Sequence, residues 1–144
     1  MFTLDSGVLL EYITVTSPNY SKVRKLLKYK LYLPLTSLTE AYYISVKLYK
    51  AMRVEDPEVE AEKLFKFFLN HPNLEVVTPN SEIALKAGKI KEKYRVSLAD
   101  SYVIATAETT STKPLFRKIE RELADKYWEL KQKYNLTVLS ELKI

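Results

Sequence analysis

Residues 96–107 read VSLADSYVIATA, and from Leu98 to Glu108 the chain is apolar on nearly every side of a helix. A helix of that kind belongs in the interior of a protein. The same segment holds an acid, Asp100, close to the start of the helix. An ionised carboxylate beside residues such as Val103 is costly to bury unless it is paired, hydrogen-bonded or bound to a cation. The segment therefore predicts a central helix with an acid at its start that needs a partner.

Strand and helix patterns alternate on both sides of this segment. We expect strands at 1–4, 31–35, 74–77, 114–116 and 136–139, and helices at 6–12, 18–30, 37–51, 57–68, 80–94, 98–108 and 118–133. Such alternation is typical of a parallel sheet with right-handed crossovers. A chain of 144 residues is long enough to form one domain with its own core. The expected fold is α/β: a single three-layer α/β/α sandwich over residues 1–144, with a mostly parallel sheet.

The composition excludes several kinds of site. The chain has no cysteine, so it has no disulfide, thiolate nucleophile or cysteine zinc site. Its one histidine, His71, precedes a proline in an expected turn and cannot build a histidine metal triad. Two glycines, Gly7 and Gly88, leave no glycine-rich phosphate loop. Any chemistry must come from carboxylates, hydroxyls, lysine, arginine and tyrosine.

The charge balance leans towards polyanionic partners. Lys plus Arg is 23 and Asp plus Glu is 18, which gives a net charge of +5. An excess of this size favours nucleic acid, although a lysine-rich solvated surface explains it equally well. No apolar run approaches the roughly 18 residues of a membrane span. The first residues, Met1 to Asp5, also lack the basic start of a signal peptide. We expect a cytoplasmic protein with no membrane partner.

Three acids fall where the expected sheet would place a site. Asp5 follows the first strand, Glu40 lies near the start of the helix after the second strand, and Asp100 lies near the start of the apolar helix. In parallel sheets, ligands bind beyond the carboxyl ends of the strands. Carboxylates without histidine or cysteine select Mg²⁺ or Mn²⁺, ions that serve phosphoryl chemistry. Together with the positive net charge, this predicts metal-dependent phosphodiester hydrolysis.

The same acids also match helix caps. Ser37 to Glu40 and Ser97 to Asp100 have the spacing of a capping box, and Asp5 could cap the helix that follows it. Taken alone, each acid is better explained as a cap. Three caps at one edge of one sheet favour a site, and the two roles are compatible because a helix N-terminus favours an ionised carboxylate.

Three segments resemble the PIN domain, and the VapC type of ribonuclease toxin in particular. They are Leu4-Asp5-Ser6-Gly7-Val8-Leu9, Leu38-Thr39-Glu40-Ala41 and Leu98-Ala99-Asp100-Ser101-Tyr102-Val103-Ile104-Ala105-Thr106-Ala107. The likeness covers essentially the whole chain, and the third segment is the most specific. The resemblance implies an α/β/α sandwich with an acidic Mg²⁺ or Mn²⁺ site that cleaves single-stranded RNA. It also implies a homodimer that is inhibited by a cognate antitoxin protein.

The resemblance assigns roles to individual residues. Asp5, Glu40 and Asp100 match the first three acids of the family, as catalytic and metal-binding residues. Ser6 matches a supporting hydroxyl, although a residue in the first turn of a helix explains it equally well. The fourth acid of the family normally follows the fourth strand, where residues 111–122 contain no aspartate. Glu120 is the nearest substitute, although an ion pair on a solvated helix face also explains it.

Other candidates are weaker. Glu108 would lie about 12 Å along the helix from Asp100. Trp128 suits the core or a dimer surface better than base stacking, and core packing is the better explanation for the tyrosines near the site: Tyr12, Tyr42 and Tyr43. Two basic groups could meet phosphates or simply face solvent: Lys22, Arg24, Lys25 and Lys28, and then Arg117, Lys118 and Arg121.

Two classes of function remain open. The first is a Mg²⁺- or Mn²⁺-dependent endoribonuclease, the toxin of a toxin–antitoxin pair. The second is a catalytically impaired PIN-like module for nucleic-acid binding or assembly, which the missing fourth acid suggests. A metal-dependent DNA nuclease is a weaker third possibility.

Overall fold

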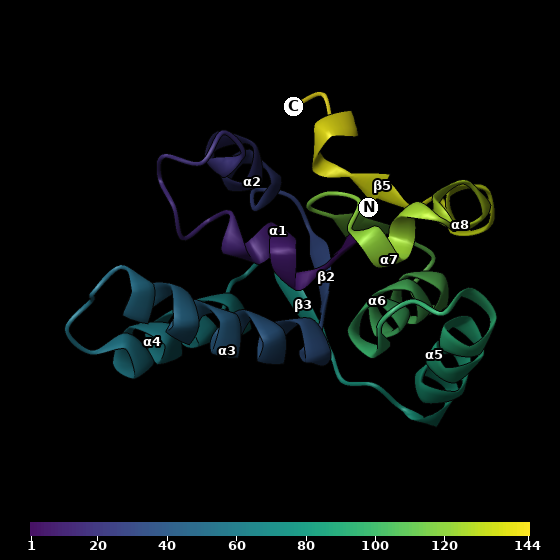
Figure 1. Cartoon of the computed structure of the whole chain (residues 1–144), viewed down its shortest axis with the longest axis horizontal. Coiled ribbons are helices and arrows are strands. Elements are labelled where there is room, and N and C mark those ends of the chain that lie inside the picture. Colours follow the sequence, from purple (N-terminus) through teal and green to yellow (C-terminus); the bar gives the residue numbers. More distant parts are fainter.

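The computed structural model describes residues 1–144, and its centre is a five-stranded sheet in which every pairing is parallel. The strands lie in the order β3-β2-β1-β4-β5 (Figure 1). Their bounds are β1 (Phe2–Leu4), β2 (Leu31–Pro34), β3 (Leu74–Val77), β4 (Lys113–Phe116) and β5 (Thr137–Val138). The predicted parallel sheet is confirmed.

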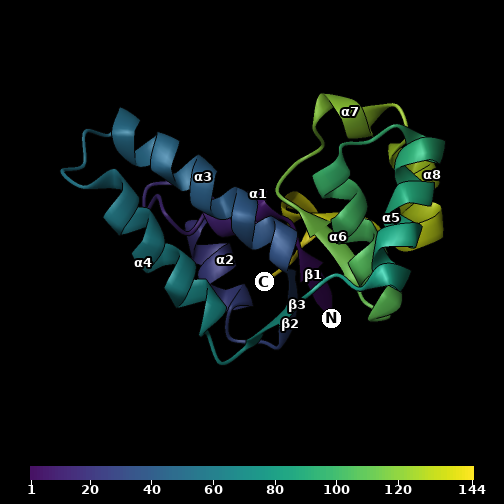
Figure 2. The same cartoon turned by 90° about the horizontal axis from the view of Figure 1, so that it is seen from below.

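Helices cover both faces of the sheet. The elements are α1 (Ser6–Leu10), α2 (Tyr20–Leu26), α3 (Leu35–Ala51), α4 (Pro57–Leu69), α5 (Ser81–Tyr94), α6 (Leu98–Thr109), α7 (Arg121–Ala124), α8 (Tyr127–Tyr134) and the 3₁₀ turn η1 (Leu139–Glu141). Figure 2 shows α1 to α4 on one side of the strands and α5 to α8 on the other. The three-layer α/β/α architecture is therefore confirmed.

Each face has its own apolar core, and the strand period of two decides which residue goes where. Leu115 packs with Leu4 and the residues of α1 to α4. Its neighbour Phe116 packs with α5, α6 and α8 on the opposite face. Both side chains are almost fully buried, so β4 holds the two cores together.

The apolar segment forms α6, as predicted. Its residues from Val103 to Ala107 are buried, while Leu98 in the first turn stays 57% exposed. Ser97 caps the helix, since its side chain accepts a hydrogen bond from the backbone N–H of Asp100 at 3.1 Å. The cap fixes the backbone of the first turn of α6, which carries Asp100.

Two predicted features are wrong. Residues 118–133 do not form one long helix but two, α7 and α8, separated at Asp125 and Lys126. Leu123 and Leu130 are nevertheless both buried in the same core, so the apolar spacing suits two short helices as well as one long one. Ser37 is not a cap, because α3 begins at Leu35 directly after Pro34. No linking residue separates β2 from α3.

The chain reverses its direction of travel across the sheet beside β1. It adds β2 and β3 on one side of β1, and then β4 and β5 on the other. In parallel sheets, ligands bind outside the carboxyl ends of the two strands that such a switch point separates, here β1 and β4, and we call this region at the sheet edge the crevice. Asp5 is the first residue after β1, and Arg117 is the first after β4. No helix of the chain combines the length and the apolar character needed to cross a bilayer.

Candidate active site

Asp5 stands at the mouth of the crevice. Its backbone N–H donates to the carbonyl of Leu115 in β4 at 3.0 Å. Its side chain caps α1, where Oδ2 accepts from the N–H of Gly7 at 3.1 Å. The predicted cap is therefore confirmed, and it engages only one of the two carboxylate oxygens.

Glu40 reaches the same region from the sixth residue of α3. Its Oε1 accepts a hydrogen bond from the hydroxyl of Ser6 at 3.1 Å, and its Oε2 lies 3.5 Å from the hydroxyl of Tyr43. Ser6 is buried and belongs to α1, so its hydroxyl links the helix after β1 to the helix after β2. Ser6 is also the first residue of α1, as its alternative interpretation predicted, and its support of the site stays a prediction.

Asp100 completes the set from the first turn of α6. Burial raises its pKa to about 6, which the hydrogen bond with Ser97 partly opposes and the charges of Glu40, Glu122 and Glu120 increase. Burial likewise raises the pKa of Asp5 to about 7, helped by the charge of Asp100 and, to a lesser degree, by Glu40. The three acids are thus close enough to repel one another.

No cation within the chain offsets this repulsion. None of the seven ion pairs of the structure includes Asp5, Glu40 or Asp100. Burial also raises the pKa of Glu40, against the hydrogen bonds from Ser6 and Tyr43. Carboxylates that are desolvated and mutually repelled favour any positive charge that enters between them.

The donor set fits a hard divalent cation in chemistry and charge. All three charged groups are oxygen ligands, which Mg²⁺ and Mn²⁺ prefer. The hydroxyls of Thr36 and Ser37, one turn before Glu40 on α3, are buried without a hydrogen-bond partner. As the side chains stand, however, no three acids come close enough to hold one ion directly. Magnesium commonly keeps several waters and few protein ligands, so the arrangement suits a hydrated ion.

Glu120 forms an ion pair, as its alternative interpretation predicted, but it does so outside a helix. It is exposed, and its Oε1 forms an ion pair with Nη2 of Arg117 at 3.6 Å. It stands just before α7 and not on a helix face. Its charge and that of Glu122 still raise the pKa of Asp100. Glu122 could not be identified as a neighbour of Asp100 from the sequence, because it does not directly follow a predicted strand.

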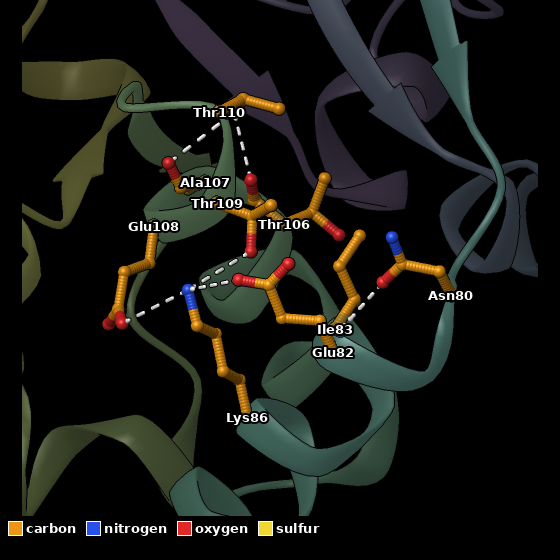
Figure 3. A network of polar contacts seen from close by, with 9 residues as sticks. All are labelled: Asn80, Glu82, Ile83, Lys86, Thr106, Ala107, Glu108, Thr109 and Thr110. Atoms are coloured by element: carbon orange, nitrogen blue, oxygen red, sulfur yellow. Dashed lines mark hydrogen bonds and ion pairs between the residues drawn. The ribbon is translucent and has the colours of Figure 1, made fainter.

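Glu108 lies at the far end of α6, as expected. Lys86 of α5 pairs there with Glu108 at 3.6 Å and with Glu82 at 3.4 Å, and it donates to Thr109 (Figure 3). This network joins α5 to α6 and contains none of the three site acids. Glu108 therefore has a structural partner of its own.

The aromatic residues considered in the sequence do not all pack in the core. Tyr12 stacks on Tyr20 and Phe67, in agreement with a packing role. Tyr43 is 45% exposed beside Glu40, and Trp128 is 72% exposed. Core packing is therefore wrong for Tyr43, and for Trp128 the dimer surface stays the prediction.

The sequence profile described as "PIN domain" matches residues 2–118. No curated protein matches the sequence closely enough to count as a relative.

Similar solved structures share the fold at low identity. VapC20 of Mycobacterium tuberculosis, described as a sarcin–ricin-loop-cleaving toxin, superposes with a TM-score of 0.65 at 9% identity, over 87% of this chain and 95% of that chain. A toxin–antitoxin complex from Klebsiella pneumoniae gives 0.62 at 13% identity, over 86% and 91%. VapBC2 of Rickettsia felis, bound to a DNA fragment from its promoter, gives 0.61 at 16% identity, over 95% and 96%. With the profile covering most of its length, the chain belongs to the PIN domain family.

Proposed function

We propose that this protein is a Mg²⁺- or Mn²⁺-dependent endoribonuclease that cleaves single-stranded RNA and acts as the toxin of a toxin–antitoxin pair. The observation that carries the proposal is the crevice between β1 and β4, where Asp5, Glu40 and Asp100 repel one another without a cation partner. PIN domains are, as a rule, nucleases. VapC20, which shares the fold, is described as a sarcin–ricin-loop-cleaving toxin.

In this mechanism the protein's own groups hold and orient the site. Asp5, Glu40 and Asp100 would hold the metal, directly or through water. A bound divalent ion lowers the pKa of water and stabilises charge on a phosphodiester in the transition state. Ser6 fixes one oxygen of Glu40, and Ser97 fixes the backbone that carries Asp100. The buried surroundings strengthen each of these interactions, because water screens them less.

The first test compares substrates. We expect the purified chain with Mn²⁺ to cut single-stranded RNA and to leave single-stranded DNA and duplex RNA intact. Excess EDTA is expected to stop the reaction, and added Mn²⁺ to restore it. Labelled oligonucleotides resolved on a denaturing gel provide the measurement. Cleavage of DNA alone would favour the DNA nuclease, and cleavage that persists in EDTA would contradict the metal site.

The alternative function is a PIN-like module that binds or assembles without catalysis. The ion pair between Arg117 and Glu120 favours it, because the acid that comes nearest in sequence to the expected fourth position already has a partner. Titration calorimetry with Mn²⁺ separates the two functions. The module predicts no binding that depends on Asp5 and Asp100, whereas the nuclease predicts binding that each substitution removes.

The proposed partners are an antitoxin protein and a second copy of this chain, in the cytoplasm where the RNA is. Toxin–antitoxin complexes are among the structures that share the fold. We expect light scattering after gel filtration to report twice the chain's 16.8 kDa. A mass of one chain at every concentration tested would refute the homodimer and leave the site unaffected.

A further inference from the structure

Arg117 enters the crevice from the side where the family's fourth acid was expected. It is the first residue after β4, beside the first turn of α1. A Cβ placed on Gly7 would lie 3.1 Å from the Cβ of Arg117 and 3.7 Å from its Nε. The same point is 3.1 Å from Oδ2 of Asp5. The arginine side chain therefore runs across Gly7, next to Asp5, and glycine leaves the space for it.

Two carboxylates flank the guanidinium. Its Nε lies 3.8 Å from Oε1 of Glu11, and its Nη2 lies 3.6 Å from Oε1 of Glu120. Glu11 is itself fixed, since its other oxygen accepts from the hydroxyl of Ser17 and its side chain is only 13% exposed. Arg117 is thus oriented by Glu11, at the end of α1, and by Glu120, just before α7.

These ion pairs orient the arginine without using its donors. Both distances exceed hydrogen-bonding range, and Arg117 makes no side-chain hydrogen bond in the structure. A guanidinium carries five N–H donors in a planar fork that matches the oxygens of a phosphate. The side chain is 37% exposed, so part of that fork is accessible to a ligand.

The arginine also leaves the metal-site acids uncompensated. It pairs with neither Asp5 nor Asp100, although it lies beside the first of them. Arg117 is therefore a cation beside the site acids that forms no ion pair with them, so it is available to bind an incoming anion. The anion that the proposed reaction brings to this place is the phosphate of the RNA backbone.

We propose that Arg117 binds a non-bridging oxygen of an RNA phosphate in the crevice between β1 and β4, and that Glu11 and Glu120 position it. This inference rests on the proposed function, since it names the substrate group that the site recognises. It gives the position of the expected fourth acid a different task, which is to hold the substrate. The metal then depends on the three acids alone.

Arg117→Gln tests the inference, with Arg121→Gln as the matched control. Arg121 is an exposed arginine of α7 with no ion pair or hydrogen bond, so its substitution changes the net charge equally. We expect Arg117→Gln to weaken binding of a fluorescent single-stranded RNA about tenfold or more in Ca²⁺ buffer, by anisotropy, and kcat/KM in Mn²⁺ to fall about as much. The control is expected to change either value less than about twofold. Arg117→Lys should recover part of the loss, because lysine keeps the charge and loses the fork.

The outcomes separate this inference from the proposed function. Mn²⁺ affinity by calorimetry is expected to be the same in the wild type and in Arg117→Gln, because the three acids are untouched. If Arg117→Gln binds RNA as well as Arg121→Gln does, the inference is overturned even when cleavage is real. If the wild type binds RNA but does not cleave it, the proposed function fails while a tenfold loss in Arg117→Gln still supports the phosphate contact. An absence of RNA binding by the wild type overturns both.

Discussion

Asp5→Asn and Asp100→Asn are each expected to reduce RNA cleavage at least about 1,000-fold. A divalent ion contributes several kcal/mol to stabilising a phosphodiester transition state, and each 1.36 kcal/mol is a factor of ten in rate. Neutralising either carboxylate removes one of the two acids with the most strongly raised pKa in the crevice. Single-turnover cleavage of a labelled RNA at saturating Mn²⁺ measures the loss.

Loss of activity through unfolding is excluded by the local structure and by a control. An asparagine at position 5 retains an oxygen that can accept from the N–H of Gly7, so the cap of α1 is preserved. Asp56→Asn makes the same chemical change at an exposed acid whose side chain caps nothing. We expect it to cleave like the wild type. Full activity in Asp5→Asn or Asp100→Asn would remove the basis of the metal site.

The sequence predicts those features that local pattern and topology determine together. The apolar run from Val103 to Ala107 has no polar face to expose, so only a buried helix accommodates it. Once the sheet is parallel, the end of β1 and the start of α6 fall at the same edge. The sequence alone therefore predicts that Asp5 and Asp100 lie at the same edge of the sheet.

The features that the sequence did not predict depend on contacts between distant segments or on exact helix starts. Nothing near Arg117 in the sequence indicates that Glu11, more than a hundred residues earlier, lies 3.8 Å away. Helix α3 begins at Leu35, directly after the last strand residue, Pro34. The capping pattern at Ser37 predicts a helix start two residues too late. Strand and helix ends of this kind are fixed by packing as much as by propensity.

Without metal, the stability of the fold is expected to fall as the pH rises from about 4 to about 7. Asp5 and Asp100 have pKa values of about 7 and about 6 in the folded chain, against 3.8 as the reference. Between those values the folded state holds protons that the unfolded state releases, so raising the pH favours unfolding. Thermal melts of the wild type and Asp5→Asn in EDTA across this range measure the effect. The variant should show the smaller decline, and an equal decline would show that Asp5 is not the group responsible.

Adding Mn²⁺ should reverse this trend, because the ion binds only the ionised carboxylates. At 100 times its dissociation constant, a ligand of the folded state adds about 2.7 kcal/mol of stability. For a chain of this size that corresponds to a rise in Tm of about 5–10 °C. We expect the rise at pH 7.5 and its near-disappearance at pH 5, where protons occupy Asp5 and Asp100 in the folded chain. Asp5→Asn should abolish the rise at both pH values, while Asp56→Asn should keep it. A Mn²⁺ shift of equal size at both pH values would mean that the ion binds outside the crevice, since Asp5, Glu40 and Asp100 are the acids whose pKa values burial raises.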